Sequence, residues 1–85
     1  MKLKDARILV TGASLGSGRA TAKVLTEAGA RVAITGRHEQ RLIEAAKAMG
    51  AVAIVADAGN PKDVERTFDE VRRHLGGLDA LINNA

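Results

Sequence analysis

The 85-residue sequence has no cysteine, tryptophan or tyrosine, and only one phenylalanine and one proline. Without cysteine, disulfide bonds, thiolate catalysis and cysteine-ligated metal sites are excluded. The two histidines, His38 and His74, are too isolated to suggest a metal site. No apolar run approaches the length of a membrane span, and residues 1–5 lack the apolar core of a signal peptide. We therefore expect a soluble cytoplasmic protein that binds no metal and contacts no membrane.

The charge pattern argues against a nucleic-acid partner. Thirteen basic and ten acidic residues give a net charge of +3, but the two signs are interspersed along the chain. The only basic cluster is residues 72–74, and no aromatic side chain lies beside it in the sequence. Binding of an anionic cofactor accounts for part of the excess, and solvated helix faces account for the rest.

The chain has the length of a single small domain, residues 1–85. A hydrophobic content of 46% is typical of a globular protein and excludes disorder. The core must be aliphatic, because the only aromatic residue is Phe68. A domain of this size buries only about 60–65% of its unfolded surface, so we expect low stability unless something docks onto it.

Hydrophobic patterning predicts an alternation of strands and helices. Four near-continuous apolar runs are typical of buried parallel strands: residues 6–10, 31–34, 51–56 and 78–82. The stretches between them have helical periodicity. The three predicted apolar faces are Ala20, Val24 and Ala28 with Thr21 and Leu25; Leu42, Ala45, Ala46 and Met49; and Val64, Phe68, Val71 and Leu75.

Capping residues support these boundaries, and together they predict the topology. Gly29, Gly50 and Gly76 occupy C-cap positions, and Asn60-Pro61 forms an N-cap followed by the first helical residue. The predicted fold class is α/β: a Rossmann-like, three-layer β-α-β-α-β-α-β unit with a parallel sheet in the order 3-2-1-4, half of a doubly wound fold. Right-handed crossovers place the first two helices on one face and the third on the other. One helix cannot cover four strands, so we expect something to cover the edge strand at residues 78–82, where Asp79 is the only gatekeeper.

A glycine-rich segment, Thr11-Gly12-Ala13-Ser14-Leu15-Gly16-Ser17-Gly18, directly follows the first predicted strand. Glycines permit a tight turn and let backbone N–H groups approach a phosphate at the positive end of a helix. Gly12, Gly16 and Gly18 have the spacing Gly-x-x-x-Gly-x-Gly. The pattern predicts a phosphate cradle. The alternative is a glycine-rich turn that opens a helix and holds no ligand.

Four separated elements together resemble the N-terminal part of a classical short-chain dehydrogenase/reductase, and the resemblance covers the whole chain. In order, they are the glycine loop, the basic residue Arg37 after the second strand, Asp57 after the third, and Asn83-Asn84-Ala85 after the fourth. The resemblance implies that the Ser14 hydroxyl and the backbone N–H groups near Leu15 and Ser17 face the cofactor phosphates. Ser17 departs from the family, which usually has an aliphatic residue there.

The resemblance also implies a cofactor preference. Where an acidic residue would bind the ribose 2′-hydroxyl of NAD, this sequence has Gly36, and Arg37 follows with a guanidinium suited to a 2′-phosphate. We therefore expect NADP(H) to be preferred over NAD(H). His38 is a second candidate for contact with the same phosphate. The alternative for Arg37 is a solvated residue that pairs with Glu39 or Glu44.

The remaining implied contacts lie after the third and fourth strands. The Asp57 carboxylate would accept from the adenine amino group, and the Ala58 N–H would donate to the adenine ring. Asn84 and Ala85 would run past the adenosine ribose toward the nicotinamide, whereas Asn83 would bond neighbouring strands. The alternative is that Asp57, Asn84 and Ala85 are ordinary loop residues.

No residue is predicted to be catalytic. The family uses a serine and a Tyr-x-x-x-Lys segment, and this sequence has no tyrosine. The resemblance thus implies a truncated, catalytically incomplete NADP(H)-binding segment of an oxidoreductase, with its C-terminal half missing. The competing interpretation is a self-assembling β/α module with an empty glycine loop, paired as a homodimer through the fourth strand or the bare sheet face.

Overall fold

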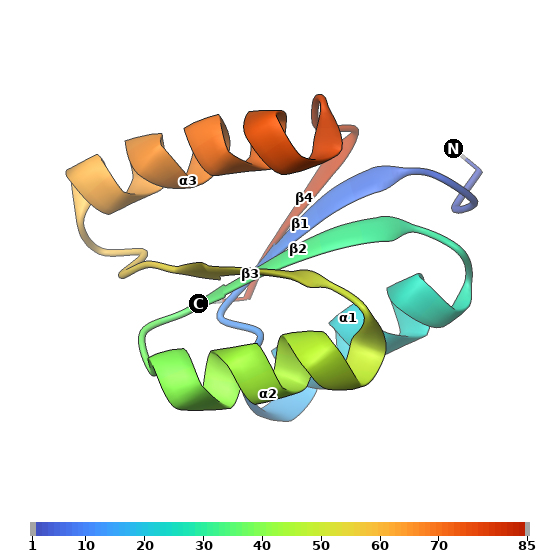
Figure 1. Ribbon diagram of the computed structural model, residues 1–85, viewed down its shortest axis with the longest axis horizontal. Helices are drawn as coiled ribbons and strands as arrows, with labels where there is room; N and C mark the ends of the chain where they lie inside the picture. Colours follow the sequence, from blue (N-terminus) through green and yellow to red (C-terminus); the bar gives the residue numbers. More distant parts are fainter. Residues whose placement is uncertain (1, 85) are drawn as a thin grey trace.

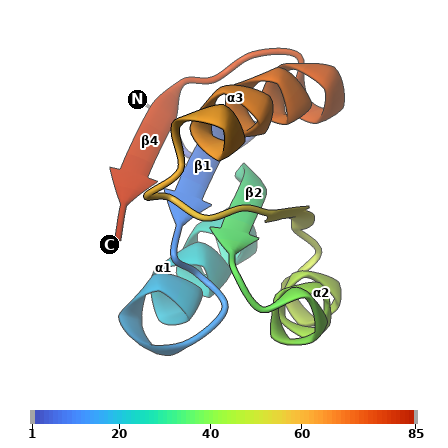
Figure 2. The same cartoon turned by 90° about the vertical axis from the view of Figure 1, so that its left-hand side faces the viewer.

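The computed structural model describes residues 2–84, which form a four-stranded sheet and three helices (Figure 1). In chain order the elements are β1 (Arg7–Thr11), α1 (Gly16–Glu27), β2 (Arg31–Gly36), α2 (Glu39–Met49), β3 (Val52–Val55), α3 (Pro61–Leu75) and β4 (Ala80–Asn83). The strands are parallel and ordered β3-β2-β1-β4. Helices α1 and α2 lie on one face and α3 on the other, as Figure 2 shows. The predicted Rossmann-like topology is confirmed.

All four strands differ at their ends from the hydrophobic runs that predicted them. β1 begins at Arg7 instead of Ala6, and β3 is Val52–Val55 instead of residues 51–56. β1 continues to Thr11, which pairs with Asn83, and β2 continues to Gly36, which pairs with Val55. β4 begins at Ala80 instead of Leu78. The extensions at the carboxyl ends have a simple cause: the backbone ladder continues through polar residues and glycine, whereas a hydrophobicity pattern ends at them. The added residues lie at the carboxyl ends of β1, β2 and β4.

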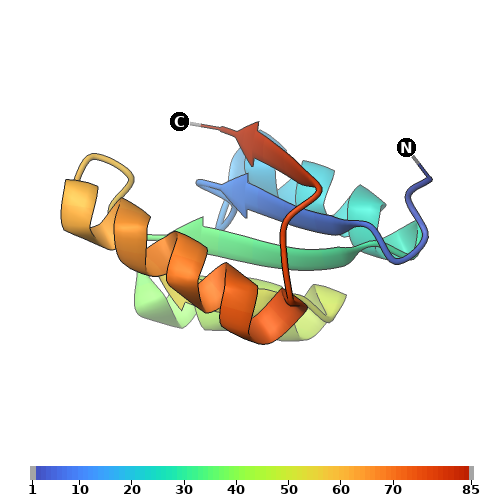
Figure 3. The same ribbon diagram turned by 90° about the horizontal axis from the view of Figure 1, so that it is seen from above.

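The core has two parts, because side chains of a strand alternate between the faces of a sheet. On the α1–α2 face the largest buried side chains are Ile8, Val10, Ile34 and Leu42. The α3 face has the smaller cluster of Leu9, Ala33, Ile54, Ala56, Val71 and Leu75. Helix α3 contacts β2 and β3 and leaves β4 uncovered on that face (Figure 3). Leu81 of β4 is 47% exposed there.

The apolar face predicted for α1 is wrong in most of its residues, whereas that of α2 is confirmed. Ala20, Val24 and Ala28 are exposed, and only Leu25 of the predicted face packs against the core. The buried residues of α1 are Gly18 and Ala22. Helix α1 begins in the glycine loop and packs very close to it, so small residues occupy the contact. Close approach, and not hydrophobicity, therefore decides which face of α1 is buried.

The face of α3 is confirmed for Val71 and Leu75, which are buried, but not for Val64, which is exposed. Thr67 is buried instead of Val64, and its hydroxyl donates to the Asp63 carbonyl at 2.7 Å. A hydroxyl satisfied within its own helix can be buried at little cost.

The caps predicted for α2 and α3 are confirmed, whereas the C-cap of α1 is Ala28, and Gly29 follows it with a φ of +93°. Gly50 and Gly76 end α2 and α3 in left-handed conformation, and each donates its N–H back to the preceding turn. The Asn60 side chain accepts from the N–H groups of Lys62 and Asp63 at 2.9 and 3.3 Å. At the other end of α3 the Arg31 guanidinium donates to the Leu75 carbonyl at 3.2 Å, which joins the helix to β2. Within residues 2–84, no helix is long and apolar enough to cross a membrane.

The start of β4 is held by Arg7 and Asp79. The Arg7 guanidinium donates to both carboxylate oxygens of Asp79 at 3.0 Å, and the Arg7 N–H donates to the same side chain at 2.8 Å. The Asp79 N–H in turn donates to the Arg7 carbonyl at 2.8 Å. Hydrogen bonds from Arg7 lower the pKa of Asp79 to about 2. Asp79, expected only as a gatekeeper charge, therefore binds β4 to β1.

This pair predicts an acid-dependent contribution to stability. The pKa of Asp79 lies below its unfolded value, so its contribution is complete above about pH 4 and is lost as the pH falls from about 4 to about 2. We expect Asp79→Asn to lower the urea midpoint at pH 7, and the difference from wild type to shrink across that window. A difference that is the same at pH 7 and pH 2 would contradict the assignment.

Candidate functional site

The glycine loop, residues 12–18, connects β1 to α1 at the carboxyl edge of the sheet. Gly12 and Gly16 both have a φ of +62°, which favours glycine. The Ala13 N–H donates to the Thr35 carbonyl at 2.9 Å, and the Gly12 N–H lies 3.4 Å from the Thr35 hydroxyl. These bonds hold the beginning of the loop against the end of β2.

The three glycines of the loop have different surroundings. A Cβ added to Gly12 would collide with the Asn84 carbonyl oxygen. One added to Gly18 would collide with the Gly12 carbonyl and lie 2.5 Å from the Asn84 side-chain nitrogen. A Cβ on Gly16 would meet nothing within 4 Å. Gly12 and Gly18 are thus required by packing within the protein, whereas Gly16 faces open space.

Asn83 and Asn84 join the end of β4 to β1 and the loop. Asn83 accepts from the Thr11 hydroxyl at 2.9 Å, so its predicted role of bonding neighbouring strands is confirmed. The Asn84 side chain donates to the Gly12 carbonyl at 3.2 Å and accepts from the Ser17 hydroxyl at 3.3 Å. The serine that departs from the family pattern therefore contacts Asn84. Ala85, also predicted at the site, lies outside the described residues.

The beginning of α1 is suited to an anion. Its N-cap residue, Leu15, is 53% exposed and makes no side-chain capping bond, and the first turn has no acidic residue. Backbone N–H groups at an uncapped helix start favour negative charge. Ser14 is half-buried beside Gly36, where an added Cβ would lie 3.2 Å from the Ser14 hydroxyl. Leu15, Gly16 and Ser17 are exposed around this helix start.

The turn from β2 to α2 presents positive charge at the same edge of the sheet. Gly36 is buried, whereas Arg37 and His38 are exposed. His38 is the N-cap of α2 but makes no side-chain capping bond. Among residues 2–84, Arg37 forms no ion pair, so the alternative of a pair with Glu39 or Glu44 is not observed.

A cavity of about 130 Å³ lies on the α3 face, beyond the carboxyl ends of the strands. Its lining comes from the strand ends, the segment after β3, and α3: Leu9, Thr11, Thr35, Ala56, Asp57, Ala58, Val64, Thr67, Phe68, Leu81 and Asn83. Thr35 also bonds the glycine loop, so the loop and the cavity share a wall. An apolar cavity of about 150 Å³ can hold a single aromatic ring, so this one has the volume for a ring and not for a dinucleotide.

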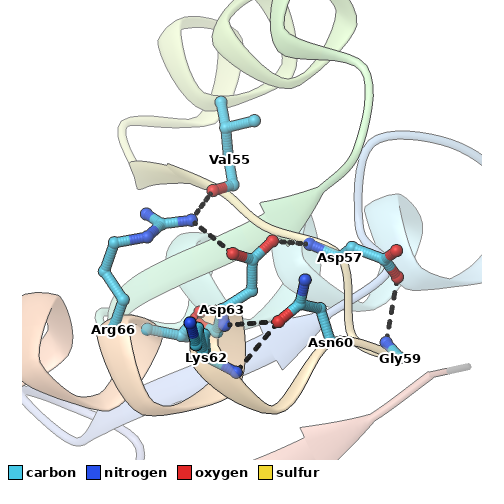
Figure 4. A network of polar contacts seen from close by, with 8 residues as sticks. Val55, Asp57, Gly59, Asn60, Lys62, Asp63 and Arg66 are labelled. Atoms are coloured by element: carbon cyan, nitrogen blue, oxygen red, sulfur yellow. Dashed lines mark hydrogen bonds and ion pairs between the residues drawn. The ribbon is translucent and has the colours of Figure 1, made fainter.

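The segment that carries Asp57 and Ala58 is held by α3, as Figure 4 shows. One Asp57 carboxylate oxygen accepts from the Gly59 N–H at 2.9 Å. The Asp57 N–H donates to the Asp63 carboxylate at 2.8 Å, and Arg66 donates to the Val55 carbonyl at 2.6 Å. Sequence reasoning identified Asp57 and Ala58 but missed Asp63, Arg66 and Thr35.

Among the described residues 2–84, no group of three or more histidine, aspartate or glutamate side chains could hold a metal ion. The arrangement instead combines an open helix start, an exposed guanidinium and a ring-sized cavity along one edge of a parallel sheet. In a Rossmann-like fold this edge is where ligands bind. These features define a Rossmann-like α/β unit with a glycine-rich turn at its first helix.

Comparison with known proteins gives the family. The family model for short chain dehydrogenase matches residues 6–85, and the chain belongs to this family, whose members use NAD(P)(H). It is 43% identical over 83 residues to human dehydrogenase/reductase SDR family member 1, covering 91% of this chain and 26% of that protein. It is 40% identical over 85 residues to glucose 1-dehydrogenase of Gluconobacter oxydans, covering 93% of this chain and 32% of that protein.

The crystal structure of apo glucose dehydrogenase of Caenorhabditis elegans has the same fold over this region. It superimposes with a TM-score of 0.91 at 34% identity, covering 100% of this chain and 39% of that one. The chain thus spans between about a quarter and two fifths of the relatives named here. It corresponds to an N-terminal fragment of a short-chain dehydrogenase.

Proposed function

We propose that this chain is the NADP(H)-binding segment of a short-chain dehydrogenase-type oxidoreductase. The observation that carries the proposal is the arrangement of three features at one sheet edge. These are the open start of α1 at the glycine loop, the exposed Arg37 after β2, and the cavity beside Asp57 and Ala58.

The residues present fit a dinucleotide. The pyrophosphate would lie at the start of α1, where Gly16 leaves open space and the backbone N–H groups of residues 15–17 are accessible, with the Ser14 hydroxyl beside them. One edge of the bicyclic adenine base would enter the cavity, with the Asp57 carboxylate and the Ala58 N–H beside it. Asn84, whose side chain bonds Gly12 and Ser17 of the loop, would contact the adenosine ribose.

Arg37 is the basis for preferring NADP(H). The end of β2 carries Gly36 and no carboxylate, so nothing there would repel a 2′-phosphate. The exposed guanidinium of Arg37, which forms no ion pair with any of residues 2–84, can form charge-assisted hydrogen bonds with a phosphate, and exposed His38 follows it.

When bound, the cofactor would supply or accept a hydride. The residues of this chain would bind and orient it, and none is assigned a catalytic role. The sequence has no tyrosine to act as the family's general acid/base. We therefore infer that this chain by itself binds cofactor and does not catalyse hydride transfer.

Titration with NADPH and NADH, followed by the fluorescence of the cofactor, tests the proposal. The absence of tryptophan and tyrosine leaves little protein background. We expect saturable binding of both cofactors, with NADPH the tighter by about tenfold, since a hydrogen-bonded charge is worth about 1.5–3 kcal/mol before screening by solvent. NADH that binds as tightly as NADPH would reject the assigned preference.

A second candidate is a self-assembling structural module with an empty glycine loop. It is favoured by the 47% exposure of Leu81 on β4, an edge strand that α3 does not cover. Two copies paired through β4 would bury this side chain in a two-fold interface. Flat titrations of a folded chain that sediments as a dimer would favour this candidate over cofactor binding.

A further inference from the structure

The edge strand β3 ends with two backbone groups that face away from β2, the strand with which it pairs. The Ala56 N–H donates to the Gly36 carbonyl at 3.0 Å, so Ala56 faces β2. Because backbone groups alternate along a strand, the Val55 carbonyl and the Asp57 N–H face outward. In an edge strand such groups have no ladder partner and are open to water or to another chain.

Asp63 and Arg66 of α3 occupy these two ladder positions. The Asp63 carboxylate accepts from the Asp57 N–H at 2.8 Å, and the Arg66 guanidinium donates to the Val55 carbonyl at 2.6 Å. The two side chains also pair with each other at 3.5 Å, one helical turn apart (Figure 4). One acceptor and one donor from a helix thus replace the backbone of a neighbouring strand.

The Val55 carbonyl and the Asp57 N–H, which α3 holds, lie next to the part of the turn that lines the cavity, Asp57 and Ala58. The Asp57 N–H is fixed by Asp63, one Asp57 carboxylate oxygen is bonded to the Gly59 N–H, and the Asp57 carbonyl accepts from the Asn60 N–H at 3.0 Å. Within residues 2–84, the other Asp57 carboxylate oxygen and the Ala58 N–H have no hydrogen-bond partner. The turn is therefore fixed by bonds within the protein, and one Asp57 carboxylate oxygen and the Ala58 N–H are left to bind a ligand.

We propose that Asp63 and Arg66 are positioning residues that hold the Asp57–Ala58 turn in the geometry that binds the adenine ring. This inference rests on the proposed cofactor-binding function. A misplaced hydrogen-bonding group weakens recognition even when the group itself is intact, so loss of the pair should reduce affinity without removing any residue that contacts the cofactor.

The test compares Asp63→Ala with Asp63→Asn and Asp69→Ala in the 85-residue chain. Asp63→Asn removes the charge but keeps an oxygen that can accept from the Asp57 N–H. Asp69→Ala is the matched control, because Asp69 pairs with Arg72 at 3.6 Å at the same i, i+3 spacing on α3 and has no bond to the turn. Arg66→Ala and Arg72→Ala form the second matched pair. Amide hydrogen exchange of Asp57 and NADPH titration are measured for each.

In Asp63→Ala we expect Asp57 exchange to be about tenfold faster and the NADPH Kd about tenfold higher, as for loss of one charge-assisted hydrogen bond. Asp63→Asn should lie between Asp63→Ala and wild type, Arg66→Ala should weaken NADPH binding, and both control variants should stay within about twofold of wild type. If Asp63→Ala does not fold, Asp57 exchange and NADPH affinity are compared in Asp63→Asn and Arg66→Ala instead.

Unchanged Asp57 exchange, or NADPH affinity equal to that of the matched control, would overturn the inference. A folded wild-type chain that binds neither NADPH nor NADH would instead reject the proposed function. In that case the comparison of Asp57 exchange still decides whether Asp63 holds the turn.

Discussion

Gly12→Ala is expected to destabilise the chain by about 2–5 kcal/mol, whereas Gly16→Ala costs only about 1–2 kcal/mol. Both glycines have a φ of +62°, so both substitutions place an L-residue in the left-handed region. Only at Gly12 does the new Cβ also collide with the backbone of Asn84, whereas at Gly16 it meets open space. The difference between the two variants isolates the close approach of β4 to the loop.

Urea or thermal unfolding measures this difference. A change of 1 kcal/mol corresponds to about 4–8 °C in the midpoint for a domain of this size. Gly12→Ala that remains unfolded while Gly16→Ala folds would agree with the prediction, because the chain has little stability to lose. Equal destabilisation in the two variants would show that the contact between Gly12 and Asn84 contributes nothing.

The same two variants separate stability from ligand binding. The new methyl group of Gly16→Ala projects into the open space proposed for the pyrophosphate. Gly16→Ala is thus expected to weaken NADPH binding by about tenfold or more through misplacement, out of proportion to its small effect on folding. Normal binding by a folded Gly16→Ala variant would contradict the location proposed for the pyrophosphate.

Arg37→Ala is expected to weaken NADPH binding by about tenfold, because it removes a charge-assisted contact with the 2′-phosphate. NADH has no such phosphate, so its affinity should change by less than about threefold. Arg37 is exposed and unpaired within residues 2–84, so the free energy of unfolding should hardly change. Fluorescence titration of both cofactors measures the ratio of the two affinities.

Lys47→Ala is the matched control for Arg37→Ala. Lys47 is an exposed base in the last turn of α2, the helix that follows Arg37, and its removal changes the net charge equally. If the two variants weaken NADPH and NADH binding to the same small extent, the effect is one of overall charge and Arg37 does not select the cofactor. A change in the NADPH-to-NADH ratio only in Arg37→Ala supports direct contact.

The structure adds to the predicted site mainly residues that would support it. Glycine spacing, Arg37 and the Asp57-Ala58 pair are visible as local motifs, and the structure places them along one edge of the sheet. Asp63 and Arg66 gave no such signal, because charged residues at this spacing are ordinary on the exposed face of a helix. Their role depends on which backbone groups of β3 face outward, and this follows only from the pairing of β3 with β2.

The amino-acid sequence by itself determined the element order, the parallel 3-2-1-4 sheet, and the caps at Asn60, Gly50 and Gly76. These features depend on hydrophobic periodicity and on backbone preferences within a few residues. Only the tertiary structure decided the buried face of α1 and the bonds of Arg7 with Asp79 and of Asn84 with Gly12. Each of those bonds joins residues 72 positions apart, so it forms only after strand register brings β4 beside β1.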